Sequence, residues 1–189
     1  MSAGTGFILA VAAGFVIVAA VVYVVLIFNG LIQLKNNIKK SWANIDVLLT
    51  QRADELPNLV TTVKGYMEHE QKTLQAVTDA RTALLNAKTI PEKAGVDNET
   101  KQAIKTLFAV AENYPNLKAN ENFLKLQNRI TGLENEIADR REFYNDSVTN
   151  YNIRIHSIPD LAVAKVLGLS DEELFSADES KKKPVEVKF

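Results

Sequence analysis

The sequence predicts an all-α protein: an N-terminal transmembrane helix followed by an elongated antiparallel helical bundle. Three observations predict it. Residues 7–28 form an uncharged apolar run, apolar residues recur after it at every third or fourth position, and no strand-like alternation occurs before the last five residues. We expect three long helices plus short C-terminal helices. The expected parts are an N-terminal segment (1–6), the transmembrane helix (7–28), the bundle (29–177) and an extended tail (178–189).

The apolar run is long enough to cross a membrane. Its 22 residues without a charged side chain would span about 33 Å as a helix, and the hydrocarbon core of a bilayer is about 30 Å thick. A buried core helix seldom contains more than about 14 such residues. A cleaved signal would have a basic N-terminal region and a shorter apolar core, whereas Met1–Gly6 contains neither Lys nor Arg. We therefore expect a retained, single-pass anchor.

Small residues line one face of this run. Gly6, Ala10 and Gly14 are spaced four residues apart, and such rows let membrane helices approach each other closely. The row favours contact between anchors, with a chance spacing as the alternative.

Charge and composition restrict the location and the partners. No Lys or Arg precedes the anchor, whereas Lys35, Lys39 and Lys40 follow it, so the positive-inside rule favours a cytoplasmic bundle. The absence of cysteine fits the cytoplasm but is also compatible with the periplasm. A net charge of −1 argues against nucleic acid as a partner.

The first helical segment after the anchor covers residues 31–88. Pro57 lies inside it, and because proline removes a backbone hydrogen bond we expect one bent helix or two nearly collinear helices. Its apolar stripe consists of Ile38, Trp42, Ile45, Leu49, Leu56, Leu59, Val63, Met67, Leu74, Val77 and Leu84.

A connection and a second helix should follow. Thr89-Ile90-Pro91 would end the first segment, Gly95 and Asp97-Asn98 would lie in the connection, and the helix would cover residues 99–113. Tyr114-Pro115-Asn116 would then turn the chain.

The third helix, residues 121–157, has the most regular apolar stripe, which includes Tyr144. After it, Asp160 would cap a short helix that Gly168 ends, and Ser170–Glu173 resembles a capping box for one last turn.

Antiparallel packing of residues 31–88 against residues 120–177 would bring the C-terminal part back toward the bilayer. The apolar residues of 160–167 would then lie near the lipid headgroups or pack at the base of the bundle. We expect packing at the base.

A charged residue interrupts the first apolar stripe. Arg52 lies three residues after Leu49 and four before Leu56, and Arg140 and Arg141 occupy a similar place on the third helix. A buried guanidinium needs a carboxylate partner, because an unpaired buried charge is costly. We expect a structural ion pair, with a contact between protomers or an exposed, snorkelling side chain as alternatives. The candidate partners are Asp46, Asp54, Glu112 and Glu134.

No arrangement of residues indicates catalysis. His69-Glu70 resembles half of a zinc-protease motif, but Thr73 occupies the position of the second histidine. The chain contains two histidines and no cysteine, so we expect no metal, no cofactor and no small-molecule substrate. The turn at Tyr114 and Pro115 would form a distal tip for partner binding, or simply a rigid turn.

Several blocks of sequence resemble the LemA family. They are Ser41-Trp42-Ala43-Asn44-Ile45-Asp46-Val47, Gln51-Arg52-Ala53-Asp54-Glu55-Leu56-Pro57-Asn58-Leu59-Val60, Thr62-Val63-Lys64-Gly65-Tyr66, Glu112-Asn113-Tyr114-Pro115-Asn116-Leu117-Lys118-Ala119, Asn122-Phe123, Arg141-Glu142-Phe143-Tyr144-Asn145, Tyr151-Asn152 and the closing Pro184-Val185-Glu186-Val187-Lys188-Phe189. The family often has Tyr-Asn after the anchor, where this chain has Phe28-Asn29.

The resemblance implies a bacterial, membrane-tethered helical bundle and no defined reaction. Some members look like periplasmic lipoproteins, which implies an extracytoplasmic bundle, opposite to the lysine bias. We expect a cytoplasmic bundle on the inner membrane, with the periplasm as the alternative.

Together these observations favour a non-enzymatic, single-pass membrane scaffold. Its helices, with stripes of coiled-coil type, would form a homo-oligomer and organise membrane or membrane-protein complexes. The alternative is an adaptor or regulator of a membrane-bound protease in envelope quality control. An enzyme is the least favoured class.

Overall fold

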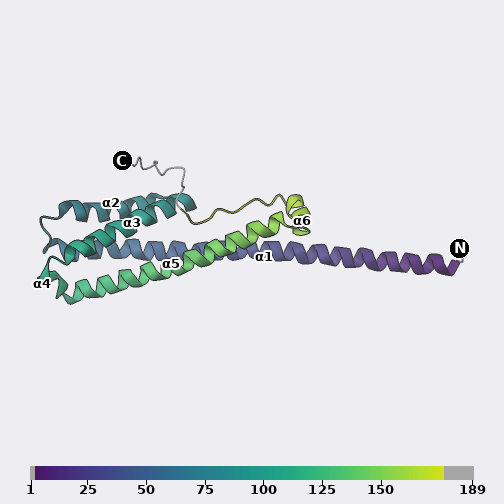
Figure 1. Ribbon diagram of the computed structural model, residues 1–189, viewed down its shortest axis with the longest axis horizontal. Coiled ribbons are helices and arrows are strands. Elements are labelled where there is room, and N and C mark those ends of the chain that lie inside the picture. Colours follow the sequence, from purple (N-terminus) through teal and green to yellow (C-terminus); the bar gives the residue numbers. More distant parts are fainter. Residues whose placement is uncertain (1–2, 177–189) are drawn as a thin grey trace, which may run out of the picture. The chain divides into compact units, whose positions relative to one another are not determined.

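The computed structural model describes residues 3–176 and contains six helices and no strand within that range (Figure 1). The predicted all-α class, with an apolar N-terminal helix and a helical bundle, is confirmed. The tail expected at residues 178–189 lies outside the described residues. The helices are α1 (Ala3–Lys64), α2 (Gln71–Asn86), α3 (Ile90–Ala111), α4 (Pro115–Lys118), α5 (Glu121–His156) and α6 (Asp160–Val166).

The first helical segment ends earlier than expected. α1 continues through Pro57 without interruption and stops at Lys64, and residues 65–70 form turns before α2. Met67 lies in this turn yet is fully buried in the same core cluster as Val63 and Leu74. Because the apolar spacing therefore persists across the turn, periodicity alone did not reveal the break.

Helix α3 begins nine residues before the expected start, at Ile90. Thr89 and Glu92 form a capping box: the Thr89 hydroxyl accepts from the Glu92 N–H, and the Glu92 carboxylate accepts from the Thr89 N–H. Pro91 lies in the first turn, where its missing N–H costs nothing. Gly95 and Asp97 consequently belong to α3 and not to a connection.

The C-terminal elements match the expectation in part. α5 ends one residue before the expected boundary, and Gly168 ends the short helix α6 with a φ of 63°. Pro159 occupies the N-cap position that Asp160 was expected to fill. The helical turn expected at Ser170–Glu173 does not form, because side chains of α5 bind the backbone of that segment, as described below.

The chain divides into two compact units. Of the described residues, unit 1 contains 3–39 and 147–172, and unit 2 contains 40–146 and 173–176. In unit 2, α2 and α3 lie side by side, and one apolar cluster joins helices α1 to α5. Its buried members are Leu56, Leu59, Val63, Met67, Leu74, Val77, Ile104, Leu107, Ala111, Leu117, Phe123 and Ile130.

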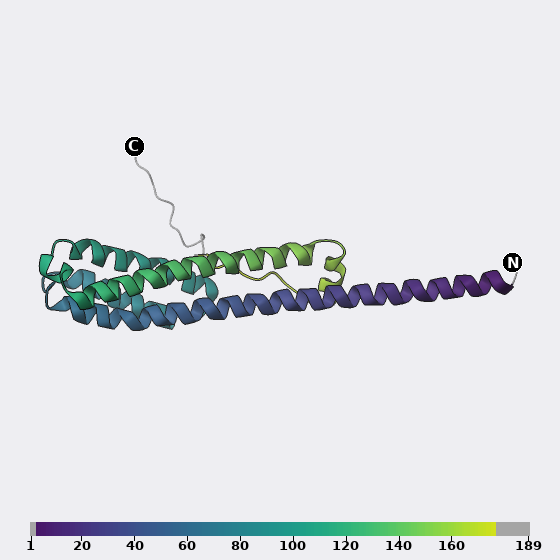
Figure 2. The ribbon, with the colours of Figure 1, turned by 90° about the horizontal axis from the view of Figure 1, so that it is seen from below.

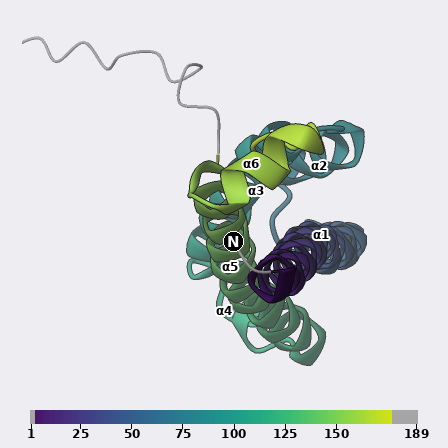
Figure 3. The same cartoon turned by 90° about the vertical axis from the view of Figure 1, so that its right-hand side faces the viewer.

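Unit 1 combines the N-terminal part of α1 with the end of α5 and with α6. α6 lies across the end of α5 (Figure 3), and α1 continues beyond α6 with no other segment of the unit beside it (Figure 2). That stretch is long and apolar enough to cross a membrane, and almost none of it is buried. Burial on α1 begins with Ile27 and Leu31.

Candidate functional site

The most deeply buried charge in unit 2 is Arg52 on α1, whose side chain is fully buried. Its Nη1 donates to Glu134 Oε1 on α5 at 2.6 Å, and its Nη2 lies 2.7 Å from Asp97 Oδ1 on α3. Asp97 also accepts from Arg141 of α5 at 3.0 Å. Two cations and two anions therefore form one network that connects three helices. This network gives the buried guanidinium the carboxylate partners that it requires.

This network confirms the expected ion pair and identifies its partners. Glu134 was among the candidate carboxylates, but Asp97 was not, because the connection was expected to contain it. Asp46 pairs with Lys93 instead. Glu112 pairs with Lys118, and Asp54 is exposed.

The two adjacent arginines of α5 differ in environment. The Arg141 side chain is largely buried, and its guanidinium carbon lies 4.8 Å from the centre of the Phe175 ring. Arg140 is exposed and pairs with Glu136, one turn away, at 3.6 Å. The expectation that both arginines lie on the core stripe is thus wrong for Arg140, because consecutive helical residues point about 100° apart.

An aromatic cluster holds the non-helical C-terminal segment in unit 2. The Phe175 ring centre lies 5.8 Å from that of Trp42, which lies 6.0 Å from Tyr144. The fully buried Tyr144 donates its hydroxyl hydrogen to the Glu173 carbonyl at 2.8 Å. Asn145 accepts from the Phe175 N–H at 2.8 Å.

The same device recurs in unit 1, two helical turns along α5. Asn152 accepts from the Glu172 N–H at 2.9 Å and donates to its carbonyl at 3.0 Å. Side-chain amides thus satisfy backbone groups that a helix would otherwise pair, which explains why the predicted turn is absent. Sequence reasoning missed this role, although the spacing of Asn145 and Asn152 by seven residues was visible.

Pro57 leaves a carbonyl without its helical partner, and a second helix supplies the donor. Residue 57 has no N–H for the carbonyl of Ala53, four residues earlier. Arg81 of α2 donates from Nε to that carbonyl oxygen at 2.9 Å. A hollow of about 270 Å³ beside this contact is lined by Leu56, Pro57, Val60, Thr61, Val77, Thr78 and Arg81.

The turn at Tyr114 and Pro115 lies within unit 2 between α3 and α5. Tyr114 donates to Glu70 at 3.3 Å, and burial together with the Glu70 carboxylate raises the pKa of the Tyr114 phenol above its usual value near 10. Pro115 begins α4 and is exposed. These contacts fix the turn, and its use as a partner-binding tip stays a prediction.

A second polar cluster lies in unit 1. Lys35 of α1 pairs with Glu172 at 3.1 Å, and this hydrogen bond raises the Lys35 pKa. Arg154 of α5 donates from Nε to Asp160 at 2.6 Å, and its guanidinium lies against Gly30 of α1. A Cβ at position 30 would stand 3.2 Å from the Arg154 Nη1, so glycine permits this close approach.

The small residues of the apolar segment remain open. Gly6, Ala10 and Gly14 are exposed, and a Cβ added at Gly6 or Gly14 would meet nothing within 4 Å. Within the chain, therefore, no described segment uses this face.

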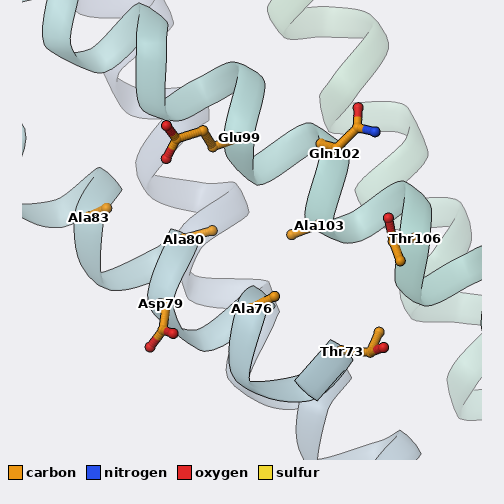
Figure 4. Close-up of a pocket in the computed structure, with 9 residues that line it drawn as sticks. All are labelled: Thr73, Ala76, Asp79, Ala80, Ala83, Glu99, Gln102, Ala103 and Thr106. Atoms are coloured by element: carbon orange, nitrogen blue, oxygen red, sulfur yellow. The ribbon is translucent and has the colours of Figure 1, made fainter. Parts of the chain in front are cut away.

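An apolar hollow lies between α2 and α3 (Figure 4). It encloses about 490 Å³, and Ala76 and Ala80 of α2 point across it toward Ala103 of α3. Thr73, Asp79, Ala83, Glu99, Gln102 and Thr106 complete the lining. The small alanine side chains create the space, and no group suited to acid–base or nucleophilic chemistry is buried in it.

The half-motif at His69 is placed in the turn after α1 and not on a helix, and its side chain is exposed. Among the described residues, no three His, Asp or Glu side chains come together as a metal ion would require.

Comparison with known proteins gives consistent matches. The sequence profile of the LemA family matches residues 41–189. Protein LemA of Metamycoplasma hominis is 29% identical over 164 residues, covering 84% of this chain and 73% of the relative. Magnetosome protein MamQ 2 of Paramagnetospirillum magneticum is 23% identical, and Magnetosome protein MamQ of Magnetospirillum gryphiswaldense is 20% identical. Both MamQ alignments cover 84% of this chain and 68% of the relative.

Proposed function

We propose that this chain, which belongs to the LemA family, is a non-enzymatic scaffold held in the bacterial inner membrane by a single span. It self-associates and organises membrane or membrane-protein complexes. The observation that carries the proposal is the continuity of α1. The same uninterrupted helix contains the exposed apolar segment and the buried Arg52. One part of this helix is held in the bundle by buried ion pairs, and its N-terminal part is apolar on all sides. Such a helix is suited to hold a rigid module at a membrane.

The pairing of the buried charges supports a structural role. Arg52 pairs with Glu134 and Asp97, and Asp97 also pairs with Arg141, so these charges support the fold. A catalytic group would instead need to face a hollow that admits substrate. Relatives named as magnetosome proteins also favour a role within a larger assembly over that of a free enzyme.

The face with Gly6, Ala10 and Gly14 is the surface that we assign to self-association. Small side chains allow two helix backbones to approach closely in lipid, where van der Waals packing drives association. The open space at both glycines leaves this face free for a second copy.

The mass distribution of the full chain in mild detergent tests this proposal. We expect oligomers for the native sequence and mostly monomers for Gly14→Leu. Ala12→Leu is the matched control, because residue 12 lies on the opposite side of the helix and should leave the oligomer intact. A native chain that stays monomeric at high concentration would refute self-association. Crosslinking in membranes that captures a protease and no second copy would support the adaptor hypothesis instead.

The lysine residues beside the apolar segment are the basis for the side of the membrane that we propose for the bundle. Lys35 and Lys39 lie just after the apolar segment, so we propose a cytoplasmic bundle. Digestion of the C-terminal region in inverted vesicles but not in spheroplasts would support this orientation, and the opposite pattern would place the bundle in the periplasm.

A further inference from the structure

Two apolar side chains of unit 1 are almost completely exposed. Ile158, in the turn between α5 and α6, is 89% exposed, and Val166, at the end of α6, is 88% exposed. These are the largest exposed fractions among the large hydrophobic residues that the structure describes, larger than those in the apolar segment of α1. Single exposed apolar residues are common, but two on one small, fixed element need an explanation.

The contacts of α5 show where this element lies along α1. Tyr151 of α5 lies near Lys35, whose charge lowers the Tyr151 pKa against the larger effect of burial, and Arg154 lies against Gly30. From the first contact to the second, the residue number increases by three on α5 and decreases by five on α1. The two helices therefore run antiparallel here. Ile158 follows Arg154 in the same direction, so it lies beyond the level of Gly30, toward the end of the uncharged run that closes at Phe28. Figure 1 shows α6 beside α1 at this end of α5.

The element is fixed in that position. Asp160, the first residue of α6, is buried and accepts from Arg154 at 2.6 Å. Ala164 is 2% exposed and anchors the inner face of α6. Packing at the base of the unit therefore accounts for Ala164, as expected from the sequence, but not for Val166 on the outer face.

We propose that residues 157–167, here called the α5–α6 wedge, form a second membrane contact, with Ile158 and Val166 inserted at the boundary between lipid headgroups and acyl chains. The occupant is a bilayer, because the wedge lies at the C-terminal end of the apolar segment of α1 and would meet the same membrane surface. Lys165, exposed beside Val166, can keep its ammonium at the headgroups.

Hydrophobic insertion and not charge drives this contact. In unit 1, Lys35 and Arg154 are paired with Glu172 and Asp160, and the cations exceed the anions by only one. The wedge should therefore bind neutral lipid as well as anionic lipid. The inference relies on the membrane anchor but is independent of self-association.

Fluorescence quenching in proteoliposomes tests the proposal with the full chain. The native sequence has no cysteine, so Ile158→Cys and Val166→Cys each allow one environment-sensitive label. Val18→Cys reports on the anchor. Leu124→Cys, on α5 in unit 2 and 41% exposed, is the matched control. Labels at 158 and 166 should be quenched by nitroxide-bearing phosphatidylcholine and protected from aqueous iodide, and the label at 124 should behave in the opposite way.

Other quenching results would overturn the proposal in distinct ways. Iodide quenching at 158 and 166 equal to that at 124 would place the wedge in water. Protection from iodide without lipid quenching would indicate a protein contact, such as a second copy. Protection only with anionic lipid would contradict hydrophobic insertion. A label at 18 that lipid nitroxides fail to quench would refute the anchor as well, whereas loss of oligomers alone would leave the wedge intact.

Discussion

Two stretches of α1 differ in a way that hydropathy alone would not predict. Between residues 7 and 25 the helix is apolar and exposed on all sides, whereas between residues 45 and 63 it buries an apolar stripe that includes the charged Arg52. The charge is buried because α3 and α5 provide Asp97 and Glu134 at the right positions. The apolar residues are exposed because no described segment covers them. Burial is therefore decided by the partners that a segment finds, and the first stretch has the length and hydropathy that suit lipid.

The largest expected effect comes from breaking the ion network. Arg52→Met leaves Glu134 without its partner and removes one of two cations from Asp97, so we expect a loss of about 3–5 kcal/mol in the free energy of unfolding. Arg140→Met is the matched control, because an exposed pair contributes about 0–1 kcal/mol. Denaturant titration of helical circular dichroism in detergent measures both. Equal, small losses for the two variants would show that the network does not stabilise the bundle.

The next effect compares apolar residues on the two stretches. Leu59 is fully buried in the core cluster, so Leu59→Ala should cost about 2–5 kcal/mol of unfolding free energy. Val18 is 61% exposed, and Val18→Ala should leave bundle stability unchanged within about 0.5 kcal/mol. The same titration measures both, and a comparable loss for Val18→Ala would mean that the apolar segment packs against protein.

A smaller effect concerns the proline inside the second stretch. Arg81→Met removes the donor to the Ala53 carbonyl and should cost about 1.5–3 kcal/mol, the range for a hydrogen bond from a charged group. In a Pro57→Ala background, the new N–H at residue 57 can bond to that carbonyl, so the same change should cost under about 1 kcal/mol. A double-mutant cycle measures the coupling. Additive losses would show that Arg81 does not substitute for the missing helical bond.

The smallest effect is visible only at high pH. Burial raises the pKa of the Tyr151 phenol above its usual value near 10, and its hydroxyl has no hydrogen-bond partner among residues 3–176. The stability linked to this group is present below pH 10 and is lost as the pH rises through the raised folded-state pKa. Tyr151→Phe should change the free energy of unfolding by less than about 0.5 kcal/mol at pH 7. Between about pH 9 and pH 11, the free energy of unfolding should fall less in this variant than in the native protein. Unfolding titrations at these three pH values measure this, and an equal fall in both proteins would refute it.

Periodicity and caps predicted most of the fold. The apolar stripes of α1 and α5 predicted the long helices, and the length of the uncharged run predicted the apolar segment. Both signals are local in the sequence. The break at residues 65–70 escaped notice because the buried Met67 preserves the spacing through the turn. The start of α3 was missed because Thr89 and Pro91 were interpreted as a stop, whereas Thr89-x-x-Glu92 is a start.

The candidate site was predictable only in part. Arg52 was conspicuous because it interrupts an apolar stripe, and Glu134 was a reasonable partner. Asp97 could not be found, since its burial depends on where α3 begins and on how that helix packs. The roles of Asn145, Asn152 and Arg81 depend equally on backbone groups that only the folded chain brings near them.

A spin-label scan of α1 in reconstituted bilayers tests the central claim most directly, because the cysteine-free chain accepts one label at a time. If this stretch lies in lipid, labels at every position from 7 to 25 should show high oxygen and low aqueous-nickel accessibility. A helical period is expected from 31 to 63, with minima at Leu49, Leu56 and Leu59. Free access of the nickel reagent between residues 7 and 25, or a loss of helical period before residue 63, would contradict the claim that one helix joins lipid to the ion-fixed bundle.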